Sequence, residues 1–70
     1  MDISDIARKA LEAAYAASVT NLYNVLTDAI MAAANNQEEI RAAKERFMKG
    51  LAFAKKAYEE ALAIIEMVKK

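Results

Sequence analysis

AAYAASVTNLYNVLTDAIMAAA, residues 13–34, decides the fold because only one of its 22 residues, Asp28, carries a formal charge. The other 48 residues carry the remaining 19 charges. A stretch so poor in charge is expected to be buried on most sides. It also contains two Asn, two Thr and one Ser. Lipid would leave those polar groups unsatisfied, so we expect burial against protein and no membrane span.

Length and composition indicate a single all-α domain over residues 1–70. A chain with no Pro, one Gly and 17 Ala contains almost nothing that interrupts a helix. Such a short chain buries only about 60% of its unfolded surface, so it needs additional stabilisation. The absence of Cys and His removes disulfides and structural zinc. Close helix packing and oligomerisation remain, and we expect both.

The first helix is predicted over about residues 3–34, with Asp2 or Ser4 as its N-terminal cap. Residues 18–21 (SVTN) have low helix propensity and allow a bend, but no Gly or Pro enforces a break. A helical projection gives two stripes that one partner helix cannot cover together. The core-facing stripe contains Leu11, Tyr15, Val19, Leu22, Leu26, Ile30 and Ala33. The second begins with Ile3, Ile6, Ala10, Ala14 and Ala17 and continues with Asn21, Asn24, Asp28 and Asn35.

A turn at residues 35–37 is predicted to join two antiparallel helices. Asn35 can adopt the left-handed conformation that ends the first helix, and Asn36 can cap the second with Glu39 at its third position. So short a connection makes the helices neighbours. The first 36 residues have a net charge of −2 and residues 37–70 a net charge of +2, which favours the two halves lying together.

The second helix, about residues 37–69, repeats every seven residues. Gly50 could end a helix, but no capping residue follows it, so we expect the helix to continue and Gly50 to permit a close helix contact. The repeat consists of Ile40, Phe47, Ala54, Ala61 and Val68, with Ala43, Gly50, Ala57 and Ile64 three residues later. Leu51, Tyr58 and Ile65 widen this face, while Phe53, Leu62 and Met67 lie outside it.

Several functional classes are disfavoured by the composition. A net charge of zero gives no field to attract nucleic acid. The start MDISDIARKA lacks the pattern of a signal peptide, so a cytoplasmic or recombinant soluble protein is expected. Without His or Cys the chain offers no Ser-His or Cys-His nucleophile, and its adjacent acidic pairs diverge around a helix. We therefore predict no enzyme, no metal site and no cofactor.

Asn21, Asn24 and Asp28 form a polar stripe with three interpretations. It is either a solvated flank or a buried polar layer that fixes the register of an oligomer. In the third, symmetry copies of the stripe line a pore or a small-ligand pocket. A related hypothesis, a ligand-binding or catalytic bundle, would place Tyr15, Tyr23 and Asp28 around one cavity.

Two resemblances bear on the architecture. EEIRAAKERF (residues 38–47) and KKAYEEALAIIEMVKK (residues 55–70) resemble the idealised Glu/Lys/Ala/Leu helices of computationally designed helical bundles, over about half of the chain. The plan of about 70 residues in one hairpin is also similar to the needle subunits of type III secretion systems, which polymerise into a tube. The Pro-containing turn and aromatic N-terminal segment of those subunits are absent here. Both resemblances imply a helical hairpin that assembles.

The sequence therefore predicts an antiparallel helical hairpin that packs into a homo-oligomeric bundle and serves structural self-assembly. The alternative is an interaction module that binds a helix of another protein. The predicted interface contains Leu11, Tyr15, Val19, Asn21, Leu22, Asn24, Leu26, Asp28, Ile30, Phe47, Gly50, Leu51, Ala54, Ala57, Tyr58, Ala61 and Ile64.

Overall fold

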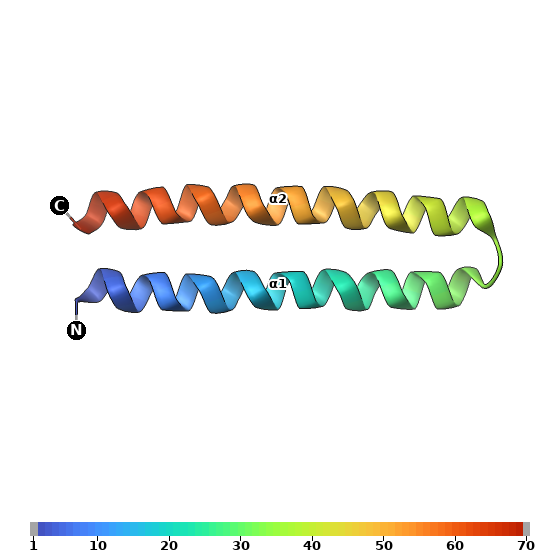
Figure 1. The fold of residues 1–70 in the computed structure, drawn as a ribbon, viewed down its shortest axis with the longest axis horizontal. Helices are drawn as coiled ribbons and strands as arrows, with labels where there is room; N and C mark the ends of the chain where they lie inside the picture. The colour runs from blue at the N-terminus through green and yellow to red at the C-terminus, as the bar shows by residue number, and fades with distance from the viewer. Residues whose placement is uncertain (1, 70) are drawn as a thin grey trace.

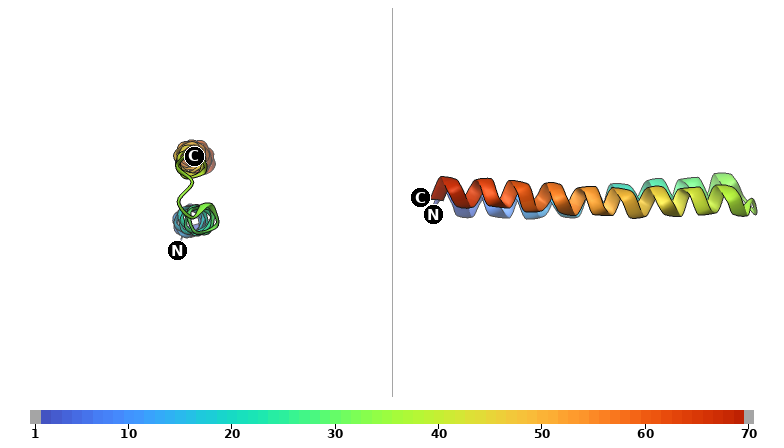
Figure 2. Two further views of the ribbon diagram at one scale, coloured as in Figure 1. Left: turned by 90° about the vertical axis from the view of Figure 1, so that its right-hand side faces the viewer. Right: turned by 90° about the horizontal axis from the view of Figure 1, so that it is seen from above.

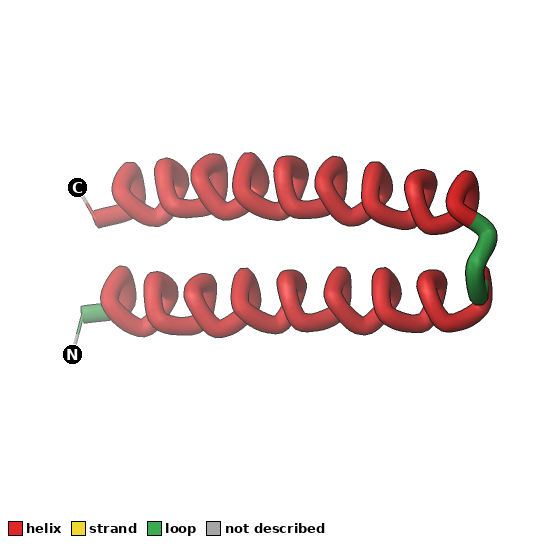
Figure 3. Tube along the Cα trace, turned by 45° about the vertical axis from the view of Figure 1, so that its right-hand side comes forward, coloured by secondary structure: helices red, strands yellow, loops and turns green. Residues whose placement is uncertain are grey.

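The computed structural model describes residues 2–69, apart from the side chain of Lys69, as two helices joined by one short loop. Helix α1 runs Ile3–Ala33 and helix α2 runs Gln37–Lys69. They lie side by side and antiparallel, with both chain ends at one end of the hairpin (Figure 1). Residues 34–36 form the connection at the other end (Figure 3). The prediction of an all-α antiparallel hairpin is confirmed.

Neither helix is interrupted at the points that the sequence left open. Thr20 donates its hydroxyl to the carbonyl oxygen of Ala16 at 3.1 Å, and Thr27 does the same to Tyr23 at 2.9 Å. These hydroxyl groups are thus satisfied inside α1 without breaking it. α2 likewise continues through Gly50. Both helices span the whole length of the hairpin as single elements.

Local hydrogen bonds fix where each helix begins. Asp2 has an extended backbone, and its carboxylate accepts the Ser4 amide at 3.4 Å and the Ser4 hydroxyl at 2.8 Å. The side-chain oxygen of Asn36 accepts the amides of Glu38 at 3.1 Å and Glu39 at 3.2 Å. Each cap satisfies amides that the first turn of a helix leaves without an intrahelical partner. The predicted cap at Asn36 is confirmed.

The predicted left-handed residue was wrong by one position. Ala34, not Asn35, has a positive φ, with φ 53° and ψ −115°. The chain must reverse between the last turn of α1 and the cap at Asn36, and the amide of Asn36 bonds the Ala33 carbonyl at 3.0 Å. That bond leaves Ala34 as the residue that turns the chain. A side chain in this region of φ/ψ is strained, because glycine alone adopts it readily.

The two helices meet along a line in which facing residues have numbers that sum to about 73. Tyr15 stacks on Tyr58 with ring centres 4.8 Å apart and an interplanar angle of 27°. Arg8 Nη2 donates to Glu66 Oε2 at 2.6 Å, and Leu22 lies against Gly50. We call two residues level when they obey this rule. The rule assigns the residues of α1 from Ser4 onward a level neighbour on α2.

The predicted heptad of α2 follows this contact line as far as Ala54, and after that only Ala61 of the repeat stays half-buried. In this part of α2 Tyr58 and Ile65 are half-buried, whereas Ala57, Ile64 and Val68 are exposed. Leu62, predicted to lie outside the contact face, is half-buried as well. An α-helix with 3.6 residues per turn drifts by about 20° per heptad relative to a 3.5-residue repeat. The contact line therefore moves by one residue towards the C-terminal end of α2.

The hairpin is one helix thick. Its Cα atoms extend over 53 × 17 × 7 Å, and the end view shows two helices with nothing on either broad face (Figure 2). Among the described residues the buried apolar side chains are Ala33, at 7% exposure, and Ala43, at 3%, and no large side chain is fully buried. The core is thus a single line of half-buried side chains between the helices.

Gly50 tests how closely the helices approach. A Cβ atom at residue 50 would lie 2.5 Å from Leu22 Cδ2, so the leucine would have to move. Gly50→Ala should stabilise α2 by about 1 kcal/mol through its higher helix propensity, but displacing Leu22 should cancel part of that gain. In a Leu22→Ala background no leucine has to move, so Gly50→Ala should give the whole gain. The difference between its effects in the two backgrounds, the coupling free energy, should be about 0.5–1 kcal/mol. Chemical denaturation of the four proteins measures it. Equal gains in both backgrounds would show that the helices do not touch here.

Candidate functional site

The predicted interface residues divide into two groups. Those that share the contact line are half-buried between α1 and α2: Leu11, Tyr15, Val19, Leu22, Leu26, Ile30, Phe47, Gly50, Leu51, Ala54, Tyr58 and Ala61. The others are exposed: Asn21, Asn24, Asp28, Ala57 and Ile64. The first group holds the hairpin together. The second is available to another molecule.

Within one hairpin, Tyr15, Tyr23 and Asp28 do not surround a common cavity. Tyr15 stacks on Tyr58 inside the hairpin, whereas Tyr23 is 59% exposed and Asp28 is exposed. Five residues separate Tyr23 from Asp28, which places them about 140° apart around α1. Side chains that are near in sequence on a helix need not share a face, and in one hairpin these three do not.

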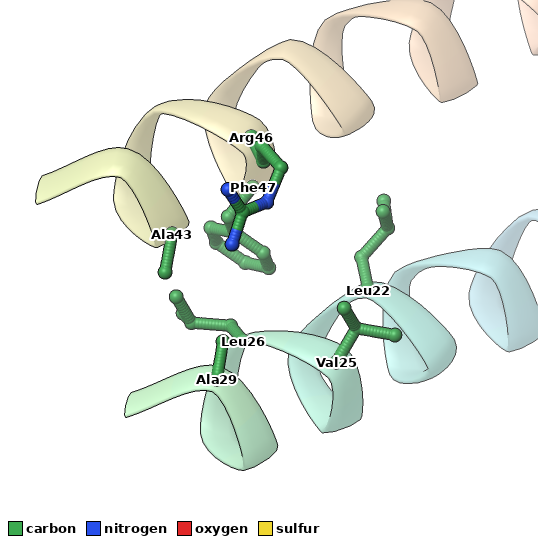
Figure 4. A pocket seen from close by; sticks show the side chains of 7 residues that line it. All are labelled: Leu22, Val25, Leu26, Ala29, Ala43, Arg46 and Phe47. Atoms are coloured by element: carbon green, nitrogen blue, oxygen red, sulfur yellow. The ribbon is translucent and has the colours of Figure 1, made fainter. Parts of the chain in front are cut away.

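Three shallow hollows follow the contact between the helices. The first, of about 110 Å³, has Leu22, Val25, Leu26 and Ala29 of α1 on one side and Ala43, Arg46 and Phe47 of α2 on the other (Figure 4). The second shares Ala29 and Arg46 with it and reaches Ala32 and Ala42 near the loop. The third lies between Leu11, Ala14 and Ser18 of α1 and Ala54, Ala57 and Ala61 of α2.

All three hollows open on the same broad face of the hairpin. Their α1 residues 11, 14, 18, 22, 25, 29 and 32 follow one another at steps of three or four, the spacing of one helix face. We call it the groove face and define it by Ala14, Val25 and Ala32 of α1 with Arg46 and Ala57 of α2. Pockets for small molecules enclose roughly 300–1,000 Å³. Two of the hollows, of about 110 and 240 Å³, fall below this range, and the second, of about 330 Å³, is at its lower limit, so side chains are the favoured occupants.

Large apolar side chains lie exposed on this face. Phe53 precedes Ala57 by four residues, and Ile64 and Val68 follow it by seven and eleven, so all three share its side of α2. Ile3 precedes Ala14 by eleven residues on α1. Their exposures are 73% for Phe53, 60% for Ile64, 66% for Val68 and 72% for Ile3. The terminal half of the groove face is therefore apolar.

The opposite broad face carries the ion pairs. Asp5 and Glu66 each lie two residues from Ile3 and Ile64, about 200° around their helices. Arg8 bonds Glu66 at 2.6 Å and Asp5 at 3.4 Å. The hydrogen bond and charge of Glu66 raise the pKa of the Arg8 guanidinium. This exposed network links the helices weakly at the terminal end, because exposed ion pairs contribute little.

Other kinds of site find no support in the geometry. Over residues 2–69 no three His, Cys, Asp or Glu residues gather in a way that could hold a metal ion. Neither described helix has a stretch that is both long and apolar enough to cross a membrane. Comparisons with protein families, with curated proteins and with solved structures find no match. Among the described residues, the groove face is therefore the feature that bears on function.

Arg46 was not singled out from the sequence, although it borders two of the three hollows. A signal for it existed. Once the turn is placed at residues 34–36, the level rule puts residue 46 beside residues 27 and 28 of α1. Asp28, the one charge of the uncharged stretch, thus has a basic residue level with it. Reading each helix by itself misses this relation.

Proposed function

We propose that this protein is a structural self-assembly module, a helical hairpin that associates with copies of itself into a helical bundle. The observation that carries the proposal is the single layer. Domains are normally built from at least two packed layers around a core, because one layer cannot bury its apolar faces. Here no large side chain among the described residues is fully buried.

Surface area supports the same conclusion. The hairpin exposes 5493 Å², whereas a compact monomer of 7.7 kDa would expose about 4,300 Å². The excess is about 1,200 Å², and a standard interface covers about 800 Å² on each partner. One interface of that size with a second copy would therefore cover about two thirds of the excess.

The experiment is sedimentation equilibrium combined with thermal unfolding over a hundredfold range of concentration. Folding coupled to association makes the midpoint rise with protein concentration. We expect an assembly at micromolar concentration and a midpoint that rises by several degrees over that range. A folded, cooperative 7.7 kDa monomer whose midpoint is independent of dilution would overturn the proposal. It would favour a module that binds another protein's helix.

A further inference from the structure

The groove face is the surface that a second copy would cover. It combines the three hollows with the apolar side chains of Ile3, Phe53, Ile64 and Val68, whereas the ion pairs of Arg8 lie on the other side. Large exposed apolar patches usually mark interfaces, and burying unpaired charges is costly. Two groove faces in contact make four helices around one core.

Symmetry leaves two ways to place two groove faces together, because the commonest dimers have one two-fold axis and an interface made of the same patch on both copies. The axis can run along the hairpin or across it. An axis along the hairpin places α1 of one copy over α2 of the other and keeps every residue at its own level. An axis across the hairpin places the terminal end of one copy over the loop end of the other.

With the axis along the hairpin, the level rule determines which residues meet. Residue 28 is level with residues 45 and 46, so Asp28 of each copy faces Arg46 of the other. Both residues are exposed, and neither belongs to an ion pair within the described residues of one hairpin. Asp28 lies three residues after Val25 and four before Ala32, which puts it on the groove face. The dimer thus contains two Asp28–Arg46 pairs, one on each side of the two-fold axis.

The same rule matches apolar residues of different size. Ile64 is level with residue 9 of α1, so in the dimer it lies between Ala7 and Ala10 of the second copy. Val68 is level with residue 5, two positions from the apolar Ile3. The large Ile64 of α2 thus meets small residues of α1, which allows the helices to interdigitate there.

An axis across the hairpin matches these features poorly. It lays Ile3, Ile64 and Val68 at the terminal end of one copy on the loop half of the other, where Asp28 and Arg46 lie. The charges would then be covered by apolar side chains without a partner, which is unfavourable.

On the basis of the proposed self-assembly, we infer that two copies pack groove face to groove face about a two-fold axis along the hairpin, as an antiparallel four-helix bundle with reciprocal Asp28–Arg46 pairs. The polar stripe then has two environments. Asp28 lies in the interface and specifies the arrangement, whereas Asn24, about 40° further from the contact line, remains on the outer edge. Ile64 and Phe53 become core residues.

Charge reversal tests this arrangement. Asp28→Arg places two like-charged pairs in the dimer, and so does Arg46→Asp. We expect each variant alone to raise the dissociation constant by roughly tenfold or more. In an equimolar mixture each variant pairs opposite charges with the other at both contacts. The mixture should form a heterodimer with an affinity within a few-fold of the original protein, measured by sedimentation and native mass spectrometry.

The double variant Asp28→Arg/Arg46→Asp should dimerise by itself, whereas the heterodimer in the mixture shows that the single variants fold. Glu45→Arg is the matched control, because residue 45 is exposed and lies about 100° around the helix from Arg46. Its dissociation constant should stay within about twofold of the original. A dimer that the single variants leave unchanged, or that the mixture does not restore, would overturn this arrangement but leave self-assembly standing. A trimer or larger ring would do the same, whereas a folded monomer would remove both proposals.

Discussion

Ala43→Leu is expected to lower the free energy of unfolding by about 1–3 kcal/mol, because extra methylene groups on a buried alanine overpack the contact between the two helices. Ala43 is the most buried apolar side chain of the described residues, at 3% exposure. It faces α1 at the hollow beside Leu26, close to the loop (Figure 4). The added side chain would push the helices apart where the short connection gives them least freedom to separate.

Ala52→Leu is the matched control. Residue 52 is exposed in the middle of α2, and leucine has nearly the helix propensity of alanine. Its free energy of unfolding should stay within about 0.5 kcal/mol of the original. Denaturant titration at one fixed protein concentration compares the two variants. A gain in stability for Ala43→Leu would mean that the space between the helices near the loop accommodates a leucine, which would contradict close packing there.

Ala34→Gly is expected to raise the free energy of unfolding by about 1–2 kcal/mol, because it removes the strain of a side chain at positive φ. Ala34 has φ 53° and ψ −115° while its amide bonds the Met31 carbonyl at 3.3 Å. Glycine can keep that bond and the same backbone without a Cβ clash. Part of the gain is lost because glycine has more freedom in the unfolded chain.

The same substitution inside α1 should have the opposite sign. Ala13 is exposed and helical, so Ala13→Gly should lower the free energy of unfolding by about 1 kcal/mol. Thermal and denaturant unfolding of both variants, again at one protein concentration, measure the difference. Similar losses for the two variants would show that residue 34 does not turn the chain as described.

The sequence predicts the hairpin because its signals are local. A chain almost free of Gly and Pro continues as helix, and Asn36 provides a cap whose hydrogen bonds involve residues only two and three positions away. The left-handed position is less local. It depends on which residue remains between the end of α1 and that cap, so Asn35 was a reasonable but wrong prediction and Ala34 takes the role.

The sequence predicted the candidate site only in part, because the exposure of its residues depends on how the two helices pack. Ala57 and Ile64 fit a seven-residue repeat, but whether they face α1 or solvent depends on a drift that accumulates along a straight helix. Phe53 and Met67 were expected to remain outside the contact face, and each is 73% exposed. The relation between Asp28 and Arg46 requires the register of two helices, which the turn sets and neither helix contains alone.

The position of the single loop has a consequence for the folding order. Contacts near the loop close short segments of chain, whereas the bond from Arg8 to Glu66 joins residues 58 apart. The entropic cost of closing a loop grows with its length. Contacts between the helices therefore form first near the loop and last at the terminal end. Ile64 and Val68 lie at that end. In the proposed dimer, the second copy would therefore reinforce the hairpin where its own chain connectivity holds it least.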